Sequence, residues 1–143
     1  TSIHESHFIT AFKIYKDNKV FGAGNKMFRI LCSRDEYKIN RFSCSTHPHN
    51  YYLQVLSENG LIGFLIICSF FIICSLNLLR EIYFRYFYKL KKINDPCLII
   101  IIGLFINLWP VVPTGNLFNN WLSILIYFPL GFYYFFKKNY KYD

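Results

Sequence analysis

Residues 61–79 read LIGFLIICSFFIICSLNLL, nineteen residues without a charged side chain. A bilayer core of roughly 30 Å needs about 20 residues of helix to cross it, so this segment predicts a membrane-spanning helix. Just before it, the polar stretch at 44–60 contains two histidines and one carboxylate, Glu58. Placing titratable groups at the end of a membrane span costs free energy, and such groups often take part in chemistry at the membrane surface.

Two further apolar blocks follow, at residues 97–113 and 117–136. The first of these contains Asn107, Pro110 and Pro113, so it is expected to be tilted, broken or re-entrant. The block at 117–136 is long enough to cross a bilayer as a helix. With 54% hydrophobic residues, the chain is predicted to be an all-α integral membrane protein in which three spans follow a polar loop with short amphipathic helices.

The distribution of charge predicts the topology. Residues 80–96 hold five Lys or Arg against two acids, and the tail at 137–143 holds three Lys against one acid. The turn at 114–116 has no charge. Because loops rich in Lys and Arg stay in the cytoplasm, we assign 80–96 and the tail to that side and 114–116 to the outside. Parity then places the loop at 1–60 outside as well.

The net charge of +8 raises the question of nucleic-acid binding. Topology explains half of the positive charge, and the rest would face away from the cytoplasm, so nucleic acid is not an expected partner. An anionic partner outside the membrane, such as a pyrophosphate or a lipid head group, fits better. The chain starts without a Met and without a leader segment, and we therefore expect it to be the C-terminal piece of a longer membrane protein.

Within the polar loop, apolar side chains repeat at helical spacing over residues 6–16 and predict an amphipathic helix. Gly22 and Gly24 predict a tight turn that lies close to other backbone. The alternative, a phosphate-binding loop, lacks the Lys-Ser/Thr of a P-loop. Asn50 is a favourable cap and predicts a helix start, and Gly60 is expected to interrupt that helix just before the span.

Cys32 and Cys44 lie in the polar loop, twelve positions apart. In an oxidising compartment they would form a disulfide. The alternatives are two unpaired thiols, or a metal pair with His47 and His49. The charged residues between the cysteines, 34–41, show no periodicity and are expected to form an exposed loop. The other three cysteines lie in or beside apolar runs and are expected to be small core residues.

Alone, His47 and His49 are a weak signal that fits a zinc site or two hydrogen-bonded surface histidines. No further His or acid stands at ligand spacing, so we expect no metal and no cofactor. Glu58 has two interpretations: it orients the His49 ring or caps a neighbouring element, or it is a solvated acid at the membrane interface.

A longer pattern contains these histidines: His49-Asn50 is followed after nine residues by Gly60 and two residues later by Gly63. It resembles the His-Asn-x9-Gly-x2-Gly pattern of the O-antigen ligase/polymerase family of bacterial membrane glycosyltransferases. Two further elements are similar to members of that family, namely Phe21-Gly22-Ala23-Gly24 with Phe28, and Asn116 with Asn119-Asn120-Trp121. The resemblance covers most of this chain, but only the last part of such a protein.

The resemblance implies transfer of a glycan from an undecaprenyl-pyrophosphate carrier to an acceptor sugar hydroxyl. The loop with the site would lie on the periplasmic side of the bacterial inner membrane, in a multi-pass protein. In a ligase of lipopolysaccharide biosynthesis the acceptor is the lipid A core, whereas in a polymerase it is another lipid-linked repeat; we favour the ligase. A non-catalytic membrane transporter or scaffold fragment is the alternative of another class. The chain alone is expected to be inactive.

The resemblance also carries the catalytic-histidine role onto His49, which would act as general base with His47, Asn50 and Glu58 in support. An imidazole is a suitable base near pH 7, and the pyrophosphate leaving group mainly needs cations to hold it. The family uses basic loop residues to hold the pyrophosphate, and its members often have an Arg at the position that His4 occupies in this chain. The candidates for pyrophosphate binding are Arg29, Arg41 and His4.

Overall fold

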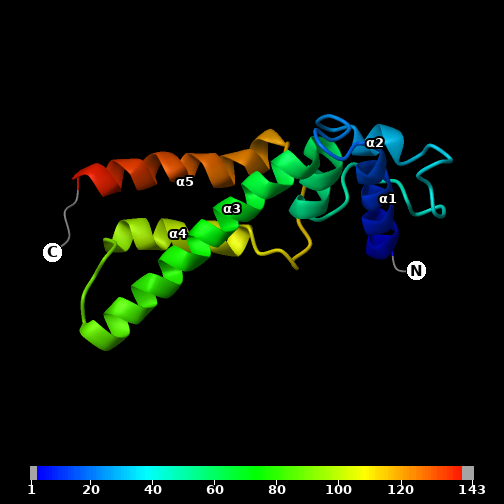
Figure 1. The fold of residues 1–143 in the computed structure, drawn as a ribbon. Coiled ribbons are helices and arrows are strands. Elements are labelled where there is room, and N and C mark those ends of the chain that lie inside the picture. Colours follow the sequence, from blue (N-terminus) through cyan, green and yellow to red (C-terminus); the bar gives the residue numbers. More distant parts are fainter. Residues whose placement is uncertain (1–2, 140–143) are drawn as a thin grey trace. The chain divides into compact units, whose positions relative to one another are not determined.

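The computed structural model describes residues 3–139, and these residues form helices and loops without a strand (Figure 1). The prediction of an all-helical chain is confirmed for them. The helices in order are α1 (Ile3–Asp17), α2 (Phe28–Leu31), α3 (Tyr51–Tyr88), α4 (Asp95–Asn107) and α5 (Asn120–Asn139). They divide between two compact units. Unit 1 comprises the chain through Cys68 together with Pro110–Leu122, and unit 2 comprises Ser69–Trp109 and the chain from Ser123 onward.

Helix α3 contains the predicted span at 61–79. Within the described part of the chain it is the one helix long and apolar enough to cross a membrane, by length and composition. Helix α4 is apolar but has only 13 residues. Helix α5 has 20 residues and contains Pro129. A membrane-spanning role for these two helices therefore stays a prediction.

The two ends predicted for the first part of α3 are confirmed. The Asn50 side-chain Oδ1 accepts hydrogen bonds from the N–H groups of Tyr52 (3.0 Å) and Leu53 (3.1 Å), as a helix cap does. At Gly60 the backbone leaves the helical conformation, with φ 67° and ψ −162°. The chain therefore forms two consecutive helices, and the break separates the polar part of α3 from its apolar part.

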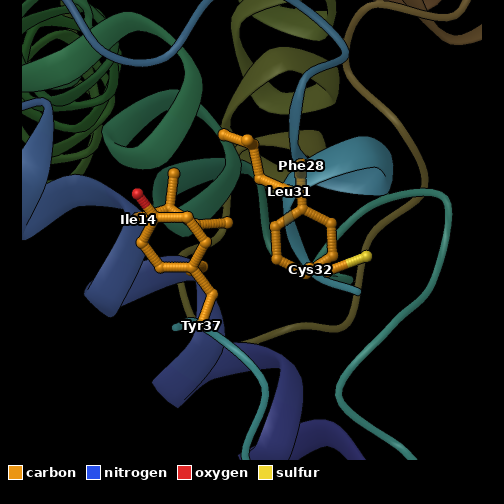
Figure 2. Packing of buried hydrophobic residues seen from close by; sticks show 6 residues of the cluster. Ile14, Phe28, Leu31, Cys32 and Tyr37 are labelled. Carbon is orange, nitrogen blue, oxygen red and sulfur yellow. The ribbon is translucent and has the colours of Figure 1, made fainter. Parts of the chain in front are cut away.

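The core of unit 1 lies between α1, α2 and the loop after α2 (Figure 2). Helix α1 extends the predicted helix at 6–16 by three residues at its start and one at its end. The expectation of an exposed loop at 34–41 holds for its charged residues but is wrong for Tyr37, which is 7% exposed. Burying this ring adds apolar area to a small core. The core residues are Ala11, Ile14, Phe28, Leu31, Cys32 and Tyr37.

In unit 2, ring contacts and one capping residue join the helices. Phe71 of α3 stacks on Phe105 of α4 with ring centroids 5.4 Å apart. The Asn94 Oδ1 caps α4 by accepting from the N–H of Cys97 (2.9 Å), and its Nδ2 donates to the carbonyl of Phe136 in α5 (3.2 Å). One amide thus caps one helix and binds the end of another.

The basic segment at 80–96 is helical to Tyr88 and then turns. Glu81, which is 1% exposed, accepts from the Arg85 Nε (2.6 Å) and from the N–H of Lys92. Arg85 also pairs with Asp95 (2.7 Å). The turn is therefore fixed by a buried carboxylate and its cation.

Candidate functional site

The four histidines of the chain gather in one cluster. His4 and His7 come from α1, and His47 and His49 come from the loop before α3. The ring centroid of His49 lies 4.2 Å from that of His47, 5.3 Å from that of His7 and 5.5 Å from that of His4. His49, the predicted base, is therefore the member that contacts each of the others.

The loop that carries His49 is held in place by the link between α4 and α5. His49 has a left-handed backbone conformation (φ 59°) and follows the buried Pro48. Its carbonyl accepts a hydrogen bond from the N–H of Thr114 (2.9 Å). The Nδ2 of Asn50 donates to the carbonyl of Pro110 (2.7 Å). Asn50 thus both caps α3 and binds the link.

Hydrogen bonds distinguish the two histidines of the loop. The Nε2 of His47 lies 3.2 Å from the carbonyl oxygen of Thr114, which can only accept, so this nitrogen carries the proton. The Nδ1 of neutral His47 then accepts from the Thr46 hydroxyl (2.9 Å). His49 pairs through Nε2 with the hydroxyl of Ser45 (3.2 Å). A hydroxyl can donate to that nitrogen or accept from it, so the proton state of His49 is less constrained.

Burial and mutual repulsion lower the pKa of three of these histidines, His7, His47 and His49, and so favour their neutral form. Burial is the main cause that lowers the pKa of His49, and the charges of His47 and His4 lower it further. Burial also lowers the pKa of His7 and of His47. A neutral imidazole can accept a proton, so three of these rings are in the form that a general base requires.

His7 was absent from the predicted site. It is 4% exposed, its ring is stacked on His49 with 30° between the planes, and its Nδ1 has no hydrogen-bond partner among residues 3–139. One sequence signal could have pointed to it. His4 and His7 are three positions apart, a spacing that places both on one face if the helix predicted at 6–16 is extended to include His4.

Glu58 caps a neighbouring segment, which is one of the roles expected for it. Its side chain is fully buried, so it is not a solvated acid. Its carboxylate accepts from the N–H of Phe28 (3.0 Å), from the N–H of Lys26 and from the Nε2 of Gln54 (3.2 Å). Burial raises the pKa of this carboxyl, while those hydrogen bonds oppose the rise. Glu58 therefore binds the segment that follows the turn at Gly22 and Gly24, which we call the glycine turn.

That glycine turn packs on the break in α3. Gly22 has φ 74°, and a Cβ on it would collide with the backbone of Glu58. A Cβ on Gly60 would collide with the carbonyl of Val20. The N–H of Gly24 donates to the carbonyl of Glu58 (2.8 Å), so it is not directed at a ligand. The prediction of a tight turn close to other backbone is confirmed, and a phosphate cradle at this turn is not what the structure shows.

Gln54 is a second residue that the sequence analysis missed. It is fully buried. Its Nε2 donates to the Oδ1 of Asn116 (2.8 Å), and its Oε1 accepts from the N–H of Leu117 (3.0 Å). Gln54 and Glu58 stand four apart on α3 and bind each other, so one helix face holds both the glycine turn and the α4–α5 link.

A cavity of about 490 Å³ lies between these segments within unit 1. Two cations, Lys26 and Arg29, contribute to its lining, and His47 is the member of the histidine cluster that reaches it. The remaining lining residues are Thr46, Gly115, Asn116, Asn119, Asn120 and Leu122. Positive side chains at a concave surface favour an anionic ligand.

The structure separates the three candidate pyrophosphate-binding residues. Arg29 lines the cavity, whereas His4 lies in the histidine cluster. Arg41 is not among the lining residues, and its guanidinium lies over the Phe42 ring, 4.6 Å from the centroid. Lys26 was missed, although it lies two positions after Gly24 and three positions before Arg29.

Cys32 and Cys44 form a disulfide, with Cα atoms 4.9 Å apart. It links the end of α2 to the start of the loop before α3 that carries His47 and His49, which we call the histidine loop. Within residues 3–139, no group of three or more His, Cys, Asp and Glu side chains is arranged to hold a metal ion. Of the alternatives for these cysteines, the structure therefore has the disulfide.

Comparison with known proteins gives one match. The family model for O-antigen ligase matches residues 5–68, which contain α1, α2, the histidine loop and the start of α3. Searches of curated proteins and of solved structures found no match. The matched segment carries His7, His47, His49 and Glu58, and thus most of the site described above. Over residues 5–68 this chain is similar to the O-antigen ligase family.

Proposed function

We propose that this protein transfers a glycan from an undecaprenyl-pyrophosphate carrier to a sugar hydroxyl of an acceptor, with His49 as general base. Similarity to the O-antigen ligase family supports glycosyl transfer in lipopolysaccharide biosynthesis as the reaction class. The observation that carries the proposal is a cluster of four imidazoles, centred on His49, that adjoins a cavity lined by Lys26 and Arg29. Such a site combines a proton acceptor with cations for a phosphate leaving group.

In the proposed topology, three spans at 61–79, 97–113 and 117–136 anchor the site to the bacterial inner membrane. The hydrogen bond between the Thr114 N–H and the His49 carbonyl supports placing the α4–α5 link and the histidine loop on one side. The Cys32–Cys44 disulfide supports an oxidising compartment, as the periplasm is. The basic segment at 80–96 would then lie in the cytoplasm.

The proposed reaction is a single inverting displacement. His49 removes the proton from the acceptor hydroxyl while the hydroxyl oxygen forms a bond to the anomeric carbon of the donor sugar. The bond from that carbon to the pyrophosphate oxygen breaks, and the pyrophosphate leaves with its electron pair. Lys26 and Arg29 hold this anion through charge-assisted hydrogen bonds.

The base is assigned to His49 because of the hydrogen bonds of its neighbour. Both ring nitrogens of His47 are engaged, one by the Thr114 carbonyl and one by the Thr46 hydroxyl. His47 lines the cavity and its ring centroid lies 4.2 Å from that of His49, so it would orient the base and the substrate. Asn50 and Glu58 support the site by holding its segments together.

The test compares wild type with His49→Gln in membranes that contain the intact protein and a defined undecaprenyl-pyrophosphate glycan. A lipid A core and a second lipid-linked repeat are offered as acceptors. We expect wild-type product on one acceptor and a loss of about 10²–10⁴-fold in His49→Gln, the usual contribution of a general base. Product on the core indicates a ligase, and longer lipid-linked chains indicate a polymerase.

His4→Gln and His47→Gln are the matched controls, because each removes one imidazole of the same cluster. Both should lose less activity than His49→Gln. Normal transfer by a folded His49→Gln protein would contradict the role of His49, and a larger loss in His47→Gln would move the base to His47.

A further inference from the structure

The cavity beside His47 has two chemically different sides. Lys26 and Arg29 line it from the segment after the glycine turn. Three asparagines line it from the α4–α5 link and the start of α5, and we call them the amide wall: Asn116, Asn119 and Asn120. A cation pair accounts for binding of phosphate oxygens, which can only accept hydrogen bonds. Carboxamides both donate and accept, so the amide wall suits a different chemical group.

The amide wall is held in position by buried contacts. The Oδ1 of Asn116 accepts from the Nε2 of the buried Gln54 (2.8 Å) and from the N–H of Phe118 (2.9 Å). The Oδ1 of Asn119 accepts from the N–H of Trp121 (3.2 Å). These bonds fix two amides before any ligand arrives, which reduces the entropy that binding would cost.

Asn120 is available to a ligand. Its side chain is exposed and lines the cavity, and it makes no hydrogen bond within the described part of the chain. The cavity volume of about 490 Å³ lies within the range of roughly 300–1,000 Å³ typical of small-molecule sites, so it has room for more than a diphosphate.

We propose that the amide wall binds the hydroxyl groups of the sugar attached to the pyrophosphate, so that Asn119 and Asn120 contribute to the sugar specificity of the donor site. Sugar hydroxyls donate and accept hydrogen bonds, as carboxamides do, whereas the cations in the same lining suit the phosphate oxygens. This assignment rests on the proposed function, because it places the diphosphate on Lys26 and Arg29.

The test measures binding to the intact protein in lipid nanodiscs by calorimetry, without any transfer reaction. The probes are a short-chain prenyl diphosphate and the same diphosphate bearing glucose, galactose or N-acetylglucosamine. We expect wild type to bind at least one sugar-bearing probe about tenfold more tightly than the bare diphosphate, the gain of one or two good hydrogen bonds. Asn120→Ala should remove most of this gain and leave the affinity for the bare diphosphate within about twofold.

Two variants complete the design. Lys26→Gln should weaken both kinds of probe by about tenfold or more, since it removes a charged contact to the phosphates. Asn139→Ala changes the same residue type at the other end of α5, outside the cavity lining, and should change neither affinity. Asn119→Ala provides a second test of the amide wall, with thermal melting as the check of folding.

The outcomes separate the two proposals. Equal affinity of wild type for bare and sugar-bearing probes, or an equal loss on both probes in Asn120→Ala, would overturn the sugar-binding role while leaving the diphosphate site intact. If wild type bound none of the diphosphates, the proposed function itself would fail, together with the assignment that rests on it.

Discussion

Unit 1 and unit 2 are both helical, but different interactions hold them together. Unit 1 buries polar side chains such as Gln54 and Glu58, and each binds segments far away in the sequence. Among the described residues of unit 2, Glu81 near the turn after α3 is the buried charged side chain, and the helices expose large apolar side chains, including Ile73 (55%) and Ile99 (69%). Buried polar groups need specific hydrogen-bond partners, so the structure of unit 1 depends on many such contacts. The structure of unit 2 depends mainly on its apolar side chains.

Glycine substitutions should show the largest difference in stability between the two units. Gly22→Ala places a Cβ against the backbone of Glu58 at a positive φ, and we expect it to lower the free energy of unfolding by about 3–4 kcal/mol. Gly103→Ala in α4 is the control, because a Cβ there meets nothing within 4 Å. It should be neutral or stabilising by up to about 1 kcal/mol. Thermal unfolding in detergent measures both, and equal losses would remove the contrast.

The disulfide should rank next. Replacing Cys32 and Cys44 together by Ser should cost about 3 kcal/mol, because the crosslink restricts the unfolded chain. Cys68→Ser, a change at a half-buried free thiol, is the matched control and should cost about 1 kcal/mol or less. Adding a reductant to wild type should reproduce the loss of the double variant. A reductant without effect on wild-type melting would contradict the contribution of the crosslink.

The histidine cluster predicts a smaller effect that is confined to a pH window. The pKa of His7, His47 and His49 lies below the usual 6.5 in the folded state, so folding disfavours their protonation. Their contribution to stability is present above pH 6.5 and is lost as the pH falls through the lowered pKa values. Histidine NMR titration of the ring protons should show these three rings titrating below 6.5, and values above it would sink the prediction. Transfer activity should fall on the acid side over the same window.

The smallest effect is expected at the surface of unit 2. Lys91 pairs with Asp95 (2.9 Å), and both side chains are about half exposed. Lys91→Gln should change the free energy of unfolding by less than about 0.5 kcal/mol, because exposed ion pairs contribute little. High salt should leave the melting temperature of wild type nearly unchanged for the same reason. A loss above 1 kcal/mol would show that unit 2 relies on exposed ion pairs as well as on the buried Glu81.

Local sequence patterns predicted the local features of this chain. The cap at Asn50, the break at Gly60 and the helix at 6–16 follow from residue type and spacing, and the structure has each of them. The resemblance also pointed to the family whose model matches residues 5–68, while the catalytic role that it gives His49 stays a proposal. Each of these signals lies within a few residues of the feature that it predicts.

Such local signals could not predict the long-range contacts that assemble the site. His7 joins His49 across 42 positions, and Gln54 binds Asn116 across 62. Periodicity and capping describe neighbours along the chain, so they carry no information on which distant segments meet. Glu58 shows the same limit: its position next to an apolar span suggested an interfacial acid, but the packing of the glycine turn buries it.

The contacts of Gln54 also bear on the order in which the protein can be completed during synthesis. Its partners Asn116 and Leu117 are made more than sixty residues later, after the ribosome has added the rest of α3 and all of α4. Until then a nascent chain can form the core around Phe28, but the carboxamide of Gln54 has to be hydrated or bound by a chaperone. The asparagine-bearing side of the cavity thus arrives last, and a chain truncated after α4 would leave the site open.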